Sequence, residues 1–248
     1  MCYNLAAKER IKALQDMYGV RIDYDHAYFD GYYQISGFAH PKLPVLSMEH
    51  PQGFELMQWG LIPSWTKDEE KAKEFSNMAL NAKAETIFEK PMFRKLIMSK
   101  RCILPVDGFY EWREITKVKY PYYIFPKDGG PFTFGCIYDT WNNTETGEVI
   151  NSFSIVTTEA NEIMAMIHNS KKRMPLILSN EDWRQWVDPK TTKEEIQALL
   201  KPSANEILSY HTISKDISHR NRDTNYPEIQ KEVLYPEIGS NRVPNTLF

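Results

Sequence analysis

The central stretch of the chain, residues 102–158, restricts the possible fold more than any other feature of the sequence. It contains runs rich in β-branched and aromatic residues, CILPVDGFYEWRE, KYPYYIFPKDGGPFTFGCIYDTW and SFSIVTT, separated by Asp-Gly, Gly-Gly and Asn-Asn. Runs of this composition favour strands, and these dipeptides favour the tight turns of hairpins. The stretch therefore predicts antiparallel β-structure at the centre of the fold.

Helical patterns occur outside this stretch. Residues 5–18 place Ile11, Leu14 and Tyr18 on one stripe, with Asn4 as a candidate cap and Gly19 as a stop. Further helices are expected over 66–75, over 159–168, and over 193–200 behind a capping box of Thr192 and Glu195. We expect an α+β fold in one compact domain over 1–235, mostly antiparallel β with peripheral helices, and a loosely held tail over 236–248.

Composition narrows the class of protein. The chain is 42% hydrophobic and 13% aromatic, which is typical of a folded globule. It has no run of about 18 apolar residues and no secretion signal, so we expect a cytoplasmic protein without a membrane partner. Three widely spaced cysteines indicate neither a disulfide framework nor a metal pair, and we expect no metal and no cofactor.

The charge pattern leaves room for an anionic partner. The formal net charge is −3, which does not indicate a nucleic-acid binder. From Lys83 to Lys119, however, the sequence contains nine Lys and Arg residues and five acidic residues, a surplus of four positive charges. A basic face on a mildly acidic protein is therefore expected, because the local field decides whether a surface contacts phosphate.

Cys2 follows the initiator methionine directly. Loss of Met1 would leave Cys2 with a free α-amine and a thiol on adjacent carbons, whose ordinary pKa values of about 8 and 8.5 leave reactive fractions of both groups at neutral pH. Such a pair can condense with an aldehyde to an imine and close to a five-membered thiazolidine. The alternative interpretation is a small apolar residue near the start of a helix.

Glu111 and His168 are candidates for proton transfer. Glu111 stands between Tyr110 and Trp112, so it is either a solvated residue on the outer strand face or a partly desolvated carboxyl with a raised pKa. His168 precedes Lys171, Lys172 and Arg173. It either caps a helix end or moves protons beside a basic, phosphate-binding loop.

Two further segments carry polar or aromatic candidates. In NAKAET, residues 81–86, Asn81 can hydrogen-bond an amine or a carbonyl group, and Lys83 offers a positive charge for phosphate. In WGLIPSW, residues 59–65, the two tryptophans are either core anchors or stacking faces for unpaired bases.

In this order, MC at the start, WGLIPSW, NAKAET, CILPVDGFYEW at 102–112 and IH…RMPLIL at 167–178 resemble the SRAP family, the SOS response-associated peptidase domain. The resemblance covers residues 2 to at least 178, with a weaker echo in ISKDI at 213–217. It implies a compact, mostly β, α+β domain that acts as a monomer on abasic sites in single-stranded DNA. It also implies that a covalent crosslink between the protein and the DNA protects the lesion in the DNA damage response. The protein is then expected to be nucleoid-associated when it is bound to DNA.

The resemblance also implies roles for individual residues. Cys2 is the nucleophile that forms a thiazolidine DNA–protein crosslink through lyase-like imine chemistry, Asn81 positions the N-terminal group, Glu111 transfers protons, and His168 assists opening of the sugar ring. The positions that correspond to DNA contacts are Lys83, Trp112, Thr157 and Arg173, with Pro41 as a further candidate. The family name implies self-processing that frees Cys2, but removal of Met1 would suffice here.

The chain departs from the family pattern at several positions. It begins MCYN rather than MCGR, it reads NAKAET rather than NARAET, and Phe38 stands where an asparagine is common. Two extra residues separate His168 from Arg173, so that His168 is either displaced or restored by a bulged loop. Two other functions stay open: an N-terminal-nucleophile amidohydrolase or peptidase that uses Cys2, and a noncatalytic single-stranded DNA-binding module.

Overall fold

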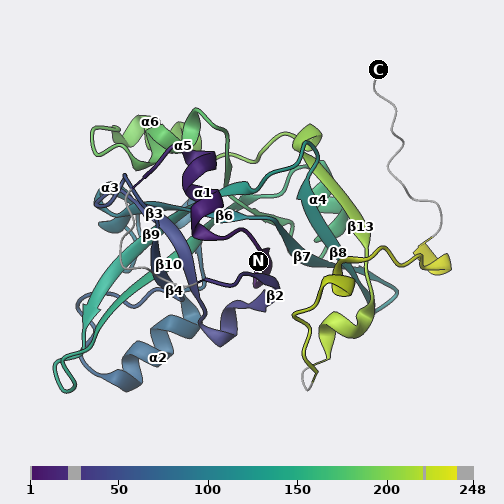
Figure 1. Ribbon diagram of the computed structural model, residues 1–248, viewed down its shortest axis with the longest axis horizontal. Helices are drawn as coiled ribbons and strands as arrows, with labels where there is room; N and C mark the ends of the chain where they lie inside the picture. The colour runs from purple at the N-terminus through teal and green to yellow at the C-terminus, as the bar shows by residue number, and fades with distance from the viewer. Residues whose placement is uncertain (1, 22–28, 220–221, 239–248) are drawn as a thin grey trace.

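The computed structural model describes residues 2–21, 29–219 and 222–238. Over these residues the fold consists of two β-sheets with short helices at the periphery (Figure 1). Most strand pairs are antiparallel, and the parallel ones involve a single strand, β10. The expectation of one compact α+β domain, mostly antiparallel with peripheral helices, is confirmed.

One sheet has five strands in the order β13-β8-β7-β1-β2. Its strands are β1 (Asn4–Ala7), β2 (Tyr32–Ser36), β7 (Gly108–Ile115), β8 (Val118–Pro126) and β13 (Leu208–Thr212). The hairpin of β7 and β8 is the longest pairing of this sheet, running from Phe109 opposite Ile124 to Ile115 opposite Val118. β1 therefore lies between this hairpin and β2, which places the start of the chain inside the sheet.

The other sheet has eight strands, in the order β11-β10-β4-β3-β6-β9-β12, with β5 paired to β10. Its strands are β3 (Lys42–Ser47), β4 (Glu55–Trp59), β5 (Asn81–Lys83), β6 (Arg101–Val106), β9 (Phe132–Asn142), β10 (Val149–Glu159), β11 (Arg173–Pro175) and β12 (Ile177–Leu178). A further pairing of β10 with β9 closes β10-β4-β3-β6-β9 into a ring. The long hairpin predicted from the central stretch is thus one wall of a closed sheet.

The helices are short and lie outside the sheets (Figure 1). They are α1 (Ile11–Tyr18), α2 (Glu69–Met78), α3 (Leu96–Ser99), α4 (Glu162–Ile167), α5 (Asp182–Val187) and α6 (Lys193–Leu199), with 3-10 turns η1 (Gly37–Ala39), η2 (Ala84–Thr86), η3 (Asn205–Ile207), η4 (Lys215–Ser218), η5 (Pro227–Gln230) and η6 (Pro236–Ile238). An α-helix occurs in each of the four segments that were predicted to be helical. Three of these helices are shorter than predicted, and α2 has the predicted length but begins and ends three residues later.

The largest correction concerns the first predicted helix. Residues 5–7 belong to strand β1, where Leu5 faces Ile35 on one side and Phe109 on the other. The side chain of Asn4 accepts a hydrogen bond from Gln34 (2.9 Å) instead of capping a helix. Leu14 and Tyr18 are buried as their spacing predicted, and Gly19 ends α1 in the left-handed region at φ 69°. Cys2 therefore precedes a strand, not a helix.

The capping box before α6 is confirmed. The Thr192 hydroxyl accepts from the Glu195 backbone, and the Glu195 carboxylate accepts from the Thr192 backbone at 2.7 Å. We expect Thr192→Ala to lower the free energy of unfolding by about 1 kcal/mol, because one N-terminal amide loses its acceptor. Thr192→Ser, which keeps the hydroxyl, serves as the control. Chemical denaturation measures both, and equal stability of the two variants would contradict the prediction.

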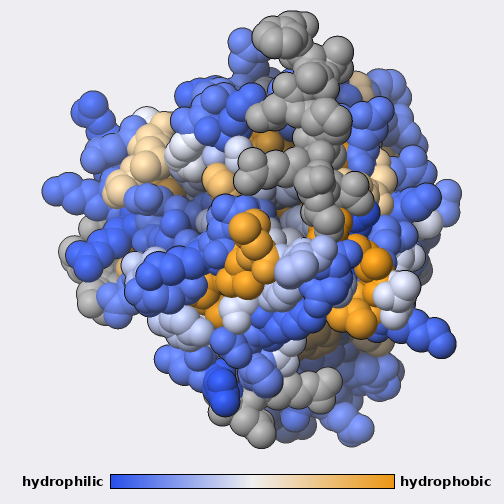
Figure 2. All heavy atoms as spheres, turned by 90° about the vertical axis from the view of Figure 1, so that its right-hand side faces the viewer, coloured by the Kyte–Doolittle hydropathy of each residue, from blue (hydrophilic) through white to orange (hydrophobic). Residues whose placement is uncertain are grey.

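The face that carries β8 and β13 is mostly hydrophilic with separate apolar areas (Figure 2). Within the described residues, no helix is both long and apolar enough to cross a bilayer.

Ile238 of η6 is buried in the main core cluster, so the described part of the predicted tail packs against the domain. The rest of that tail, residues 239–248, lies outside the described residues.

Candidate functional site

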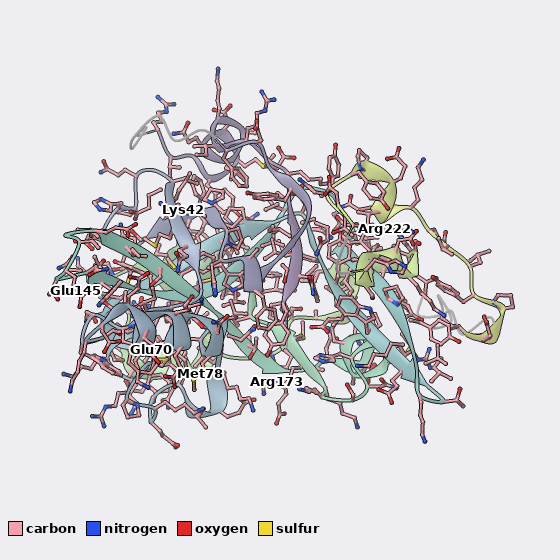
Figure 3. All side chains as sticks on the ribbon, turned by 90° about the horizontal axis from the view of Figure 1, so that it is seen from below. Lys42, Glu70, Met78, Glu145, Arg173 and Arg222 are labelled. Atoms are coloured by element: carbon pink, nitrogen blue, oxygen red, sulfur yellow. The ribbon has the colours of Figure 1, made fainter. Side chains whose placement is uncertain are left out.

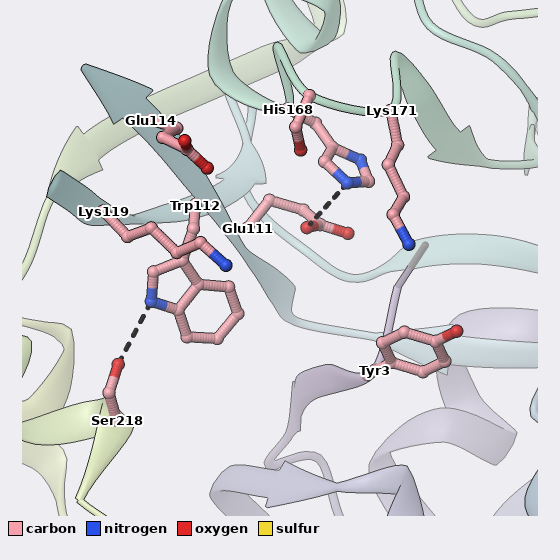
Figure 4. A pocket seen from close by; sticks show the side chains of 9 residues that line it. Tyr3, Glu111, Trp112, Glu114, Lys119, His168, Lys171 and Ser218 are labelled. Carbon is pink, nitrogen blue, oxygen red and sulfur yellow. Dashed lines mark hydrogen bonds and ion pairs between the residues drawn. The ribbon is translucent and has the colours of Figure 1, made fainter. Parts of the chain in front are cut away.

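A pocket of about 340 Å³ lies where the end of α4 approaches β7 (Figure 4). The residues that line it come from five segments, namely Tyr3, Glu111, Trp112, Glu114, Lys119, His168, Ser170, Lys171 and Ser218. Three residues singled out from the sequence, Glu111, Trp112 and His168, are therefore brought to one cavity. Figure 4 shows the His168 ring next to the Glu111 carboxyl group, with a dashed line between them.

Glu111 is a buried carboxyl group. It lies on β7 opposite Tyr122 of β8, and only 5% of the residue is exposed. Burial raises its pKa to about 8, and the nearby Lys171 ammonium counteracts part of this effect. Glu111 therefore carries its proton at neutral pH. The interpretation of Glu111 as a solvated residue on the outer strand face is wrong.

His168 is held as a neutral base. Its Nδ1 lies 3.0 Å from the Arg173 carbonyl oxygen, so Nδ1–H donates to that oxygen and the Nε2 lone pair is left on the pocket side. Nε2 lies 3.6 Å from Oε2 of Glu111. Burial lowers the pKa of His168 to about 4. The pair consequently offers a protonated acid beside an unprotonated base at neutral pH.

The four residues between His168 and Arg173 form a tight turn. The backbone N–H groups of Lys171 and Lys172 both donate to the His168 carbonyl oxygen, at 3.2 and 2.8 Å. Lys172 adopts φ 49°, in the left-handed region, which lets the turn close. Of the two alternatives for the insertion, the structure has the bulged loop, and His168 is not displaced from Glu111.

Cys2 is enclosed by the core in the chain that carries Met1. The residue is 1% exposed and belongs to the main core cluster. Burial raises the pKa of its thiol far above the ordinary value, and the Glu111 carboxylate adds to the shift. The enclosed thiol therefore stays protonated at neutral pH in this state, while the expected thiolate fraction concerns the chain without Met1 and stays a prediction.

Asn81 holds the backbone of Cys2. It lies on β5, and its side-chain N–H donates to the Cys2 carbonyl oxygen at 2.9 Å. Its buried Oδ1 has no hydrogen-bond partner among the described residues. A buried acceptor without a donor is costly, so this oxygen suits an additional N–H group close to the Cys2 backbone.

The residues predicted to contact DNA differ in their exposure and in the partners that they contact. Lys83 is exposed, and Trp112 lines the pocket and donates from Nε1 to the Ser218 hydroxyl at 3.2 Å. Arg173, labelled in Figure 3, pairs with Glu85 and donates to the carbonyl oxygen of Thr157. Thr157 itself is fully buried.

Pro41 is also buried. The side chains of Pro41 and Thr157 therefore offer no surface to a DNA strand in this structure. The charge of Arg173 is already paired with that of Glu85.

Sequence reasoning did not assign Tyr3, Lys119 or Ser218 to the site, yet all three line the pocket. Lys119 comes from the partner strand of β7, and Ser218 from η4 near the weak ISKDI echo. The cross-strand position of Lys119 depends on the register of the β7–β8 hairpin, which composition does not fix. The ISKDI echo was the one available signal for Ser218.

Residues 1–220 match the family described as SOS response associated peptidase, or SRAP. The chain belongs to the SRAP family. This SRAP chain is 42% identical over 176 residues to the abasic site processing protein YoqW of Bacillus subtilis, covering 70% of this chain and 74% of YoqW.

Other relatives of the SRAP chain extend the comparison. The abasic site processing protein YoaM of Bacillus subtilis is 37% identical over 207 residues, covering 81% of this chain and 88% of YoaM. The abasic site processing protein HMCES of Xenopus tropicalis is 31% identical, covering 72% and 57%. A crystal structure of a protein from Bacteroides thetaiotaomicron superposes with a TM-score of 0.88 at 38% identity, covering 94% of this chain and all of that one. The SRAP fold is therefore shared.

Proposed function

We propose that this protein recognises abasic sites in single-stranded DNA and forms a thiazolidine crosslink with them through Cys2. The observation that carries the proposal is the pairing of a protonated Glu111 with a neutral His168 at one pocket, next to the enclosed aminothiol residue. The names of the relatives, abasic site processing proteins, support the substrate class. The protein acts as a monomer in this proposal.

The first step opens the abasic sugar. In its closed form the sugar is a hemiacetal, and Nε2 of His168 takes the proton of the anomeric hydroxyl and delivers it to the ring oxygen as the bond between that oxygen and the anomeric carbon breaks. The products are an aldehyde and a free hydroxyl. A histidine that is already protonated could not perform this step, so the lowered pKa of His168 suits the role.

The second step joins the aldehyde to the protein. The free α-amine of Cys2 adds to the aldehyde carbon and gives a carbinolamine, whose hydroxyl leaves as water after it receives the proton of Glu111. The unpaired Oδ1 of Asn81 is suited to accept a hydrogen bond from the amine. An iminium ion and a Glu111 carboxylate result.

The third step closes the ring. The Cys2 sulfur attacks the iminium carbon, and the thiol proton passes to the Glu111 carboxylate or through Nε2 of His168. The reaction is intramolecular, so it does not depend on a high concentration of free thiolate. Glu111 regains its proton, and the overall change is condensation with loss of one water molecule.

The test is an intact-mass measurement. We expect the protein without Met1, mixed with a single-stranded oligonucleotide containing one abasic site, to give a heat-stable species with the summed mass of both less one water. An oligonucleotide of the same sequence without the lesion is the control. Absence of the adduct would contradict the proposal, and turnover of an amide in the absence of DNA would favour the amidohydrolase alternative.

A further inference from the structure

Two aromatic side chains form an outward-facing pair beside Cys2. Tyr3, the next residue along the chain, lines the pocket and is half-buried. Phe38 belongs to η1 and is 56% exposed. Their ring centroids lie 5.1 Å apart with an interplanar angle of 40°. Exposure of the apolar Phe38 ring to water is unfavourable in free energy, and its contact with Tyr3 covers only part of the ring.

The pair is held in place by its backbone. The Gly37 N–H donates to the Tyr3 carbonyl oxygen at 2.8 Å, which ties η1 to the start of β1. Gly37 also packs against the buried Trp59 ring, where an added Cβ would meet ring carbons at 3.0 Å. On the other side, His40 ends the turn at φ 48°, with Nδ1 lying 2.9 Å from the Trp59 carbonyl oxygen. The exposed ring of Phe38 is thus presented by a fixed turn.

A cation accompanies the aromatic pair. The Lys171 side chain lines the same pocket as Tyr3, and its Nζ points into the space between Glu111 and the Tyr3 ring (Figure 4). A flat π-face next to a positive charge matches one nucleotide, which carries a planar base and an anionic phosphate. A peptide or a lipid offers no comparable repeating combination.

An abasic site creates the base that such a surface needs. Where one base is missing, the neighbouring base loses its stacking partner on that side. An aromatic pair beside the residue that reacts with the lesion can replace that partner. Because stacking strength grows with ring area, a purine would gain more from the contact than a pyrimidine.

We propose that Tyr3 and Phe38 form a stacking platform for the nucleobase next to the abasic sugar, with Lys171 contacting the adjoining phosphate. The inference rests on the proposed function, because it requires that the lesion be bound at Cys2. It gives a role to two of the positions at which this chain departs from the pattern of its family, and it predicts a preference for purine neighbours.

The test measures binding without chemistry. Oligonucleotides carrying a tetrahydrofuran analogue, which has no aldehyde, are made with adenine or with cytosine on each side in turn, and Kd is measured by fluorescence anisotropy. For the unchanged protein we expect tighter binding of the adenine-flanked strand on at least one side. We expect Phe38→Asn to weaken that complex by roughly 10-fold and to remove the preference.

Two further variants make the test specific. Phe38→Leu keeps an apolar side chain but no ring, so it should lose the purine preference as well. Val149→Asn alters another exposed apolar residue, 61% exposed at the start of β10, and should leave Kd and preference unchanged. Unaltered affinity and preference in Phe38→Asn would overturn the platform.

The two proposals can fail separately. If the unchanged protein forms the heat-stable adduct but Phe38→Asn binds every strand as tightly as the unchanged protein does, the platform is refuted and the crosslinking function stands. If Phe38→Asn loses the purine preference but the aldehyde-containing strand gives no adduct, the platform stands and the crosslinking function is refuted.

Discussion

Replacement of Cys2 by serine is expected to reduce the heat-stable adduct with abasic single-stranded DNA by on the order of 100-fold or more. Serine keeps the α-amine, so the imine still forms, but its hydroxyl is a far weaker nucleophile than sulfur and the ring does not close to a stable product. Intact mass after heating measures the loss. Reduction of the unheated mixture with borohydride should still capture the imine of the Cys2→Ser variant.

The control for this experiment is another buried thiol. Cys136 belongs to the same core cluster as Cys2 but stands in the middle of β9, so it has no free α-amine. Cys136→Ala should therefore lose stability and retain the adduct. A heat-stable adduct in Cys2→Ser equal to that of the unchanged protein would show that sulfur takes no part in the product.

Replacement of Glu111 by glutamine is expected to slow formation of the adduct by roughly 10²–10⁴-fold, the usual contribution of a positioned general acid. Glutamine has nearly the same shape and can fill the same buried position beside His168, but it has no proton to give to the departing hydroxyl. Single-turnover rates with the abasic strand measure the effect. Glu114→Gln, at a neighbouring residue that also lines the pocket, is the matched control and should change the rate little.

The dependence on pH distinguishes acid catalysis from a structural effect. Glu111 has a raised pKa of about 8, so its acid form dominates below that value and is lost as the pH rises through it. The rate of the unchanged protein should accordingly decline above about pH 8. Glu111→Gln should lack this decline and continue to rise as the α-amine loses its proton. Parallel profiles for the two proteins would contradict a general-acid role.

The sequence predicted the hairpins better than the first helix for a physical reason. Within residues 102–158, β7 pairs with β8 and β9 with β10 across short connections, so local composition carries most of the information about these two hairpins. The Asp-Gly and Gly-Gly turns did not prove to be hairpin turns, because they connect strands of different sheets, and β6 pairs with the more distant β3 and β9. β1, in contrast, pairs with β2 and β7, the latter about a hundred residues away, as in the contact of Leu5 with Phe109. A helical stripe over residues 11–18 was correct, but nothing in residues 5–7 indicates those distant partners.

The site was predictable as a set of residue types and less so as a geometry. Strand alternation places Glu111 on one face of β7, but which face is buried depends on the loop after α4, which brings His168 to it. The burial of Thr157 and the Glu85 partner of Arg173 likewise arise from the pairing of β10 with β11 and β5. These contacts join segments that are far apart in the sequence, so a motif cannot reveal them.

The hydrogen bond from Asn81 to Cys2 joins the first residues of the chain to a strand of the other sheet. The reactive end is for that reason assembled only in the folded protein. Small aldehydes and oxidants in the surrounding medium meet a thiol that is protonated and enclosed, and their reaction with it is slow. Under the proposed function, Cys2 thus remains unmodified until DNA enters the site.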